Sequence, residues 1–146
     1  MFERIVVGLD GSNVSEIALR TGAELARRLE LPLHLVRVAD LAVVPWGASA
    51  AAEAYAELSG EMVREKTKAE AYLNDVAQPL RDEGLSLSTE VRSGFAAREL
   101  AEAAGADDLL VVASQGRHGL QRLVLGSVAE EVAKRARGAV LIARKS

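Results

Sequence analysis

The sequence predicts an α/β fold: an open sheet of five parallel strands with helices on both faces. Five short apolar runs, rich in Val, Ile or Leu, have the length and composition of buried strands. Segments in which apolar residues recur at helical spacing separate these runs, so that strands and helices alternate along the chain. Such alternation implies right-handed crossovers, which make the strands parallel and place helices on the two faces of the sheet.

The expected elements follow one another without a long interruption. The strands are expected at residues 5–9, 33–38, 85–91, 109–112 and 138–143. The helices are expected between them, at residues 14–29, 53–81, 94–104 and 128–135. The third strand alternates apolar and polar residues, which favours a place at a sheet edge.

The first two helices carry their own boundary signals. Asn13 lies three residues before Glu16, a variant of the capping box that begins a helix. Pro79 is expected to kink or end the long second helix, because proline lacks the N–H that a helix interior needs. The candidate buried positions of that helix are Tyr55, Leu58, Met62, Tyr72, Leu73, Val76 and Leu80. Residues 39–52, which include Trp46, are expected to form a loop.

The composition limits the class of protein. At 146 residues, 49% hydrophobic and 27% charged, the chain is most simply one domain, 1–146. Its net charge of −3 argues against a nucleic-acid surface, which requires a basic face. The chain has no cysteine, and His34 and His118 are distant in sequence, so disulfides and a Cys- or His-rich metal site are not expected. Neither a membrane span of ~20 apolar residues nor a signal peptide is apparent, which makes the cytoplasm the expected compartment.

The segment from Leu109 to Val128 has the features of an anion site. A buried strand leads into the glycine-containing loop 114–119, and the segment ends where the last helix begins. A helix N-terminus offers unpaired N–H groups and about half a positive charge, and glycines allow a ligand close to the backbone. Between Asp108 and Glu130 the chain has no acidic residue. Phosphate is the expected anion, although similar loops occur in α/β domains that bind nothing there.

A second segment is expected at the same place. In open parallel sheets, ligands lie beyond the carboxyl ends of the strands, where the strand order reverses. In the order 3-2-1-4-5 the first and fourth strands are neighbours, which brings Asp10 and the loop 113–116 to one crevice.

With the first-strand turn at residues 5–12 and the glycine spacing at residues 113–127, the chain resembles the universal stress protein family over essentially its whole length. Ile5-Val6-Val7-Gly8-Leu9-Asp10-Gly11-Ser12 is similar to the first strand and turn of that family. Its nucleotide-binding members carry Gly, two residues, Gly, nine residues, then Gly-Ser or Gly-Thr. Here Ala113, Gly116 and Gly126-Ser127 occupy these positions. Ala113 departs from the pattern, which has glycine at this position. If the backbone there were left-handed, alanine would be less favourable than glycine by about 1–2 kcal/mol. If the backbone is ordinary, the methyl matters only where a ribose or phosphate would approach closely.

The resemblance implies an adenine nucleotide alpha hydrolase-like sheet, order 3-2-1-4-5, that binds ATP, with any Mg²⁺ carried mainly by the phosphates. Leu9 and Asp10 would face the adenosine, and Val38 would line the adenine pocket. Val112 and Ala113 would lie under the ribose. The alternative is that Val38 and Val112 are core residues of any such sheet, and that Asp10 only forms a turn or caps a helix.

The same resemblance assigns the phosphates to the second half of the motif. Gly116, Gly126, Ser127 and Val128 would hold them through backbone N–H groups and the Ser127 hydroxyl. The alternative for Ser127 is a helix N-cap, whose replacement by alanine costs about 1 kcal/mol. The joint spacing of these residues favours the functional interpretation, because a fold without a ligand does not require it.

Three functions are compatible with this pattern. The leading hypothesis is an ATP-binding regulatory protein of a stress response. The second is a slow ATPase or phosphotransfer enzyme, against which the loop offers no carboxylate base and no lysine beside Ser127. The third is a dimeric interaction module whose nucleotide site has been lost at Ala113. The resemblance implies pairing of the last strand, residues 139–143, with its copy, so a homodimer is expected.

Overall fold

The protein is described by a computed structural model that covers residues 1–10, 15–39, 51–114 and 125–144, without the side chains of residues 51–59 and 61. Within these residues five parallel strands form one sheet, in the order β3-β2-β1-β4-β5. The strands are β1 (Arg4–Leu9), β2 (Leu33–Ala39), β3 (Leu87–Ser93), β4 (Asp108–Ala113) and β5 (Ala139–Ala143). The helices are α1 (Ser15–Leu29), α2 (Ala51–Asp82), α3 (Ala96–Ala103) and α4 (Ser127–Arg135). The predicted fold class and strand order are confirmed, including the edge position of β3.

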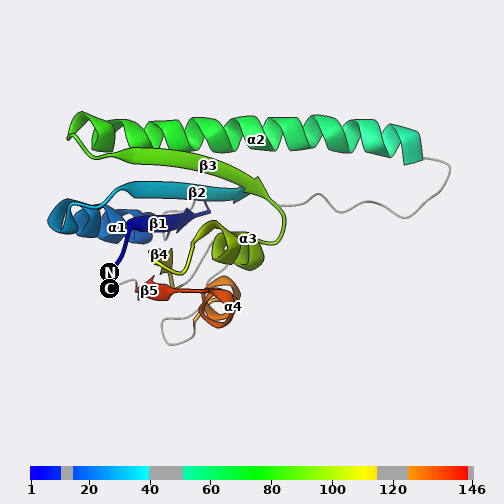
Figure 1. The fold of residues 1–146 in the computed structure, drawn as a ribbon. Helices are drawn as coiled ribbons and strands as arrows, with labels where there is room; N and C mark the ends of the chain where they lie inside the picture. Colours follow the sequence, from blue (N-terminus) through cyan, green and yellow to red (C-terminus); the bar gives the residue numbers. More distant parts are fainter. Residues whose placement is uncertain (11–14, 40–50, 115–124, 145–146) are drawn as a thin grey trace.

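Helices cover both faces of the sheet, and each face has its own core (Figure 1). The face under α1 and α2 buries odd-numbered strand residues, among them Ile5, Val7, Leu9, Leu33, Leu35, Leu109 and Val111. The face under α3 and α4 buries even-numbered ones, among them Val6, Val36, Val38, Leu110 and Val112. Because successive side chains of a strand point to opposite faces, a sheet covered on both sides needs strands that are apolar throughout.

The long helix α2 is only half supported by the sheet. Its 32 residues span about 48 Å, whereas the seven residues of β3 span about 23 Å. The helix therefore extends past the carboxyl ends of the strands (Figure 1). Residues 62–68 are all exposed, and the buried stripe begins at Ala69. The prediction that Met62 is buried is wrong, since 45% of it is exposed; the side chains of Tyr55 and Leu58 lie outside the described residues.

Several element boundaries differ from those predicted, and β3 begins and ends two residues later than expected. Helix α3 begins at Ala96 rather than at Gly94, because Gly94 has a φ of +137°, which belongs to a turn and not to a helix. Helix α2 continues through Pro79 to Asp82, so the proline does not end it there. The proline lies in the last turn, where its missing N–H costs a single backbone hydrogen bond. The loop around Trp46 and the Asn13 capping position lie outside the described residues.

No helix among the described residues is both long enough and apolar enough to cross a bilayer. The longest, α2, carries charged side chains along its exposed stretch, such as Arg64, Glu65, Lys66 and Lys68.

Candidate functional site

The carboxyl ends of β1, β2 and β4 lie side by side. Strand β1 pairs with β2 on one side and with β4 on the other, both in parallel register. The residues that follow these strands therefore meet at one edge of the sheet, as the sequence predicted for Asp10 and Ala113. The strand order reverses at this point, where open α/β sheets bind their ligands.

The apolar residues predicted for this site belong to the core. Leu9, Val38 and Val112 are each 5% exposed or less, and their side chains pack in the cores on the two faces. Because these side chains are buried in the cores, only the backbone groups of the three residues can contact a ligand at the strand ends. Asp10 and Ala113 are half-buried and lie closer to the surface.

Ala113 has an ordinary backbone. Among the described non-glycine residues, only Glu30 has a positive φ. Ala113 is the last residue of β4, and its methyl packs against the core under α1 and α2. The alanine in place of the first motif glycine therefore carries no backbone strain, and its methyl is engaged with the core.

The end of β1 is attached to the start of α1. The backbone N–H of Asp10 donates to the hydroxyl oxygen of Ser15 at 3.3 Å, and Ser15 is almost completely buried. Ser15 was not among the predicted site residues. A serine at the start of a helix is the available signal, whereas the capping-box spacing indicates Asn13, which lies outside the described residues.

Tyr72 of α2 lies next to this junction. Its hydroxyl oxygen is buried and, within the described part of the chain, has no hydrogen-bond partner of full geometry. Burial raises the pKa of Tyr72, and the nearby Glu16 carboxylate adds to the rise, while the Ser15 hydroxyl and Arg37 oppose it. The long helix thus places a buried hydroxyl group beneath the carboxyl edge of the sheet.

The end of β4 is attached to both β5 and α4. The Ser114 N–H donates to the carbonyl of Ala143 at 2.8 Å, and the Ser114 carbonyl accepts the N–H of Gly126 at 2.6 Å. The expectation that the Gly126 N–H binds phosphate is not met here, because a protein carbonyl already occupies it. Ser114 is 7% exposed and was not predicted to belong to the site. Its role depends on backbone groups, so its residue type gave no signal.

Among the described residues, the first backbone N–H groups of α4 have no acceptor. Gly126 is the N-cap residue, with φ −63° and ψ 157°, and its carbonyl accepts the Glu130 N–H at 3.0 Å. Ser127 is therefore the first helical residue and not the N-cap. The N–H groups of Ser127, Val128 and Ala129 have no acceptor within the helix. Ser127 and Val128 are exposed residues, and they lie at the positive end of the helix dipole.

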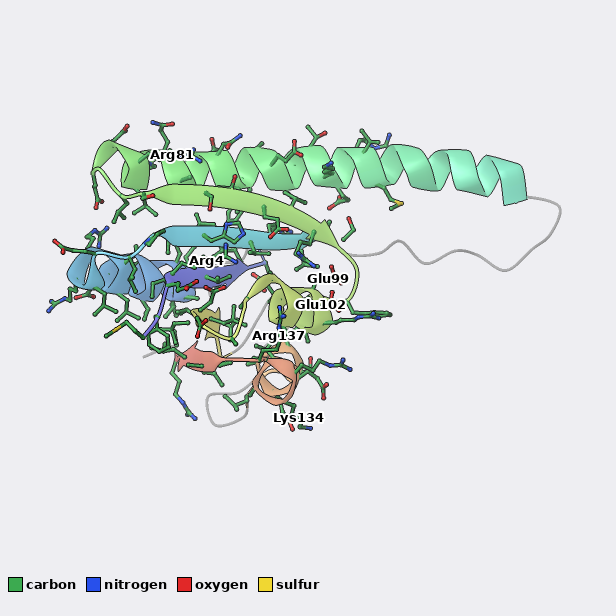
Figure 2. All side chains as sticks on the ribbon, viewed as in Figure 1. Arg4, Arg81, Glu99, Glu102, Lys134 and Arg137 are labelled. Carbon is green, nitrogen blue, oxygen red and sulfur yellow. The ribbon has the colours of Figure 1, made fainter. Side chains whose placement is uncertain are left out.

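The charges along α4 complement its dipole and stabilise the helix. Glu130 lies in the first turn, and Lys134 and Arg135 lie in the last. Lys134 extends from the helix near Glu130, with Nζ–Oε1 at 3.7 Å (Figure 2). Gly116, together with Arg117, His118 and Arg122, lies outside the described residues. Among the residues that the structure does describe, no cluster of three His, Asp or Glu side chains could hold a metal ion.

Comparison with known families agrees with this arrangement. The family model described as "Universal stress protein family" matches residues 1–144. The chain belongs to the universal stress protein family. One relative, the universal stress protein MJ0531 of Methanocaldococcus jannaschii, is 33% identical over 147 residues, which cover 99% of this chain and 84% of the relative.

Several solved structures share the fold of this universal stress protein. The hypothetical protein MJ0577 superposes with a TM-score of 0.79 at 21% identity, covering 100% of this chain and 98% of its own. A universal stress protein solved in complex with cAMP has a TM-score of 0.63 at 25% identity, covering 99% and 98%. The Archaeoglobus fulgidus universal stress protein in complex with dAMP has a TM-score of 0.58 at 19% identity, covering 97% of each chain.

Proposed function

We propose that this universal stress protein binds an adenine nucleotide, with ATP as the ligand, and acts as a regulatory protein whose behaviour depends on nucleotide occupancy. The observation that carries the proposal is the meeting of the ends of β1 and β4 with the backbone amides that begin α4. Support also comes from family members solved with cAMP and with dAMP.

The adenosine part of the ligand is assigned to the ends of β1, β2 and β4. Leu9, Val38 and Val112 supply buried backbone beneath the base and the ribose. Asp10 is the polar residue at the end of β1, and its N–H is oriented by Ser15. Ala113 fits this role, because its methyl is directed into the core.

The phosphates are assigned to the start of α4. Ser127 and Val128 donate their backbone N–H groups, and the Ser127 hydroxyl adds a further donor. The N–H of Gly126 is bonded to the Ser114 carbonyl and is not assigned to the phosphates. Gly126 instead has no side chain, which leaves space for the phosphates to approach. Gly116 belongs to the same proposal by its spacing in the sequence. Mg²⁺ would arrive with the phosphates and keep most of its water ligands. We propose that the protein binds the nucleotide in the cytoplasm.

A thermal-shift titration tests the proposal. A ligand that binds only the folded state raises its stability, by about 2.7 kcal/mol at a concentration one hundred times Kd. We expect ATP with Mg²⁺ to raise the Tm of the wild-type protein, and cAMP to raise it less because it carries a single phosphate. The absence of any shift at millimolar ATP would remove the proposal.

A proline at position 127 isolates the role of the helix amide. Ser127→Pro removes one N–H donor and the hydroxyl, yet proline is favoured at the first position of a helix. Ser127→Ala, the matched control, removes the hydroxyl and keeps the amide. We expect both variants to keep the Tm of the free protein and S127P to lose more of the ATP shift than S127A. Equal shifts in the two would exclude this amide from phosphate binding.

We also propose that the protein is a homodimer formed through β5. This strand pairs with β4 alone within the described residues, and Val140, Leu141 and Ile142 remain only half-buried. An open apolar sheet edge favours pairing with another strand. Light scattering at micromolar concentration should give the mass of two chains, and Leu141→Lys should give the mass of one. A wild-type monomer would contradict this assignment.

A further inference from the structure

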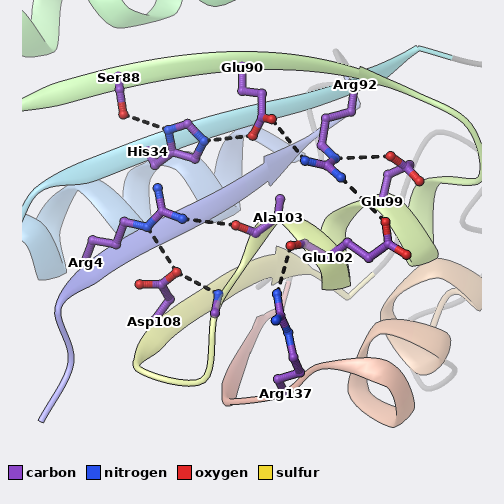
Figure 3. Close-up of polar contacts among 11 residues, drawn as sticks. Arg4, His34, Ser88, Glu90, Arg92, Glu99, Glu102, Ala103, Asp108 and Arg137 are labelled. Carbon is purple, nitrogen blue, oxygen red and sulfur yellow. Dashed lines mark hydrogen bonds and ion pairs between the residues drawn. The ribbon is translucent and has the colours of Figure 1, made fainter.

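A serine, a histidine and a glutamate form a linear hydrogen-bonded relay on β2 and β3. Ser88 and His34 are register partners on the two strands, and the Ser88 Oγ lies 2.7 Å from the His34 Nδ1. On the other side of the ring, the His34 Nε2 lies 3.0 Å from the Glu90 Oε1. Figure 3 shows the three side chains in one row. A nucleophile within hydrogen-bond reach of a base, which a third group orients, is the arrangement of activated hydroxyl nucleophiles.

The carboxylate of the relay is held in place and ionised. Arg92 donates to the Glu90 Oε2 at 3.0 Å and is itself paired with Glu99 at 3.2 Å and Glu102 at 3.6 Å. Burial alone would raise the pKa of Glu90, but the hydrogen bond from His34 and the positive charge of Arg92 outweigh it and lower the pKa. Glu90 is therefore a carboxylate at neutral pH, which can accept hydrogen bonds but cannot donate them.

The carboxylate determines which nitrogen of His34 carries the proton. Because Glu90 only accepts, the Nε2 of a neutral ring must carry the hydrogen. The Nδ1 is then an acceptor, and the Ser88 hydroxyl must donate its hydrogen to it. The serine oxygen thus already shares its proton with a base, and the base has an anion behind it to stabilise the imidazolium that proton transfer would create.

Ser88 is accessible while the base is protected. His34 is 9% exposed, whereas Ser88 lies on the surface of the edge strand. Ser88 is the second residue of β3 and lies toward the amino end of the strand, whereas the nucleotide site is proposed at the carboxyl ends of β1, β2 and β4. The relay is therefore separate from that site.

We propose that Ser88 is a nucleophile that accepts an acyl group from a neutral, activated ester. The Ser88 Oγ attacks the ester carbonyl as its proton moves to the His34 Nδ1. The tetrahedral intermediate then breaks the bond to the leaving oxygen, which takes the proton from His34. The products are an acyl-serine and the free alcohol or phenol, and no other reactant is required.

The surrounding charges favour a neutral acyl donor over a phosphate compound. Three carboxylates, those of Glu90, Glu99 and Glu102, face two guanidinium groups, those of Arg92 and Arg98. Among these acidic and arginine side chains there is one more carboxylate than guanidinium, which disfavours an anionic donor such as ATP.

Acetylation by p-nitrophenyl acetate tests the proposal on the full chain. We expect release of p-nitrophenolate together with one acetyl group on the peptide that contains Ser88, located by mass spectrometry. Ser88→Ala should remove that adduct. Ser93→Ala, which changes another exposed serine of β3, is the matched control and should acetylate at the wild-type rate.

Variants of the base and of its carboxylate separate activation from simple exposure. General-base assistance contributes about 10²–10⁴-fold, so His34→Gln should lower the rate at Ser88 at least tenfold. Glu90→Gln keeps the shape of the side chain and should also lower the rate of acetylation at Ser88. This variant provides the test if His34→Gln does not fold. Acetylation of His34 in place of Ser88 would overturn the proposal. An unchanged rate of acetylation at Ser88 in folded His34→Gln and Glu90→Gln proteins would overturn it as well.

Discussion

The backbone N–H of Gly126 donates to the carbonyl oxygen of Ser114 at 2.6 Å, and this bond closes the base of the segment between β4 and α4. The two residues enclose residues 115–125, so the bond fixes both ends of the segment that carries the motif spacing. The Ser114 carbonyl belongs to a residue that is 7% exposed. A buried carbonyl without a hydrogen-bond donor destabilises the folded state. The bond to Gly126 therefore holds the N-terminus of α4 next to the end of β4.

Gly126→Pro tests this bond. The φ of Gly126, −63°, suits proline, so the substitution removes the N–H at little cost in backbone strain. We expect a loss of about 1–3 kcal/mol in the free energy of unfolding, because the Ser114 carbonyl is left buried without its donor. Gly126→Ala keeps the N–H and should be close to neutral. Urea denaturation measures both, and equal stabilities would show that the bond contributes little.

Tyr72→Phe tests the buried hydroxyl of α2. Because this hydroxyl has no hydrogen-bond partner of full geometry among residues 1–10, 15–39, 51–114 and 125–144, its removal relieves the cost of burying a polar group. We expect the free energy of unfolding to stay constant or to rise by up to about 1 kcal/mol, measured by urea denaturation. Tyr72→Ala, which also removes the ring from the core, should destabilise the protein. A clear loss in Y72F would mean that the hydroxyl has a bonded partner in solution.

The lowered pKa of Glu90 predicts how its contribution to stability depends on pH. A carboxylate whose pKa in the folded state lies below its ordinary value of 4.5 stabilises the fold at pH above that value. The contribution is lost as the pH falls through the lower, folded-state pKa. We expect wild type to be more stable than Glu90→Gln at pH 7 and the difference to shrink below pH ~4.5. Denaturant titrations at a series of pH values measure it, and a difference that is independent of pH would refute the cause given.

The sheet was predictable because its signals are local. Each Val-, Ile- or Leu-rich run lies between turn residues, and the alternation with helices leaves few possible topologies. The errors arose where the outcome depends on neighbours in space. The periodicity of α2 continues through Met62, but periodicity does not reveal that the sheet has already ended. Gly94 precedes a helical pattern, yet its positive φ places it in the turn.

The candidate site was predictable only as far as residue spacing goes. Asp10 and Ala113 follow neighbouring strands as expected, because strand order alone brings them together. The bond between Ser114 and Gly126 involves backbone groups, which every residue except proline carries, so no residue type indicates it. The relay through His34 depends on the register of β2 against β3, which the sequence of either strand leaves open.

Two glycine-to-alanine substitutions in helices should act in opposite directions. A Cβ at Gly22 of α1 would collide with the side chain of Val7 in the core, so Gly22→Ala should cost about 1–3 kcal/mol. A Cβ at Gly60 of α2 would meet only the Arg64 guanidinium, at 3.5 Å. Gly60→Ala should therefore stabilise the protein by about 0.5–1 kcal/mol, because alanine has the higher helix propensity. Urea denaturation of both variants measures these changes, and a stable G22A would show that α1 can move away from β1 at little cost.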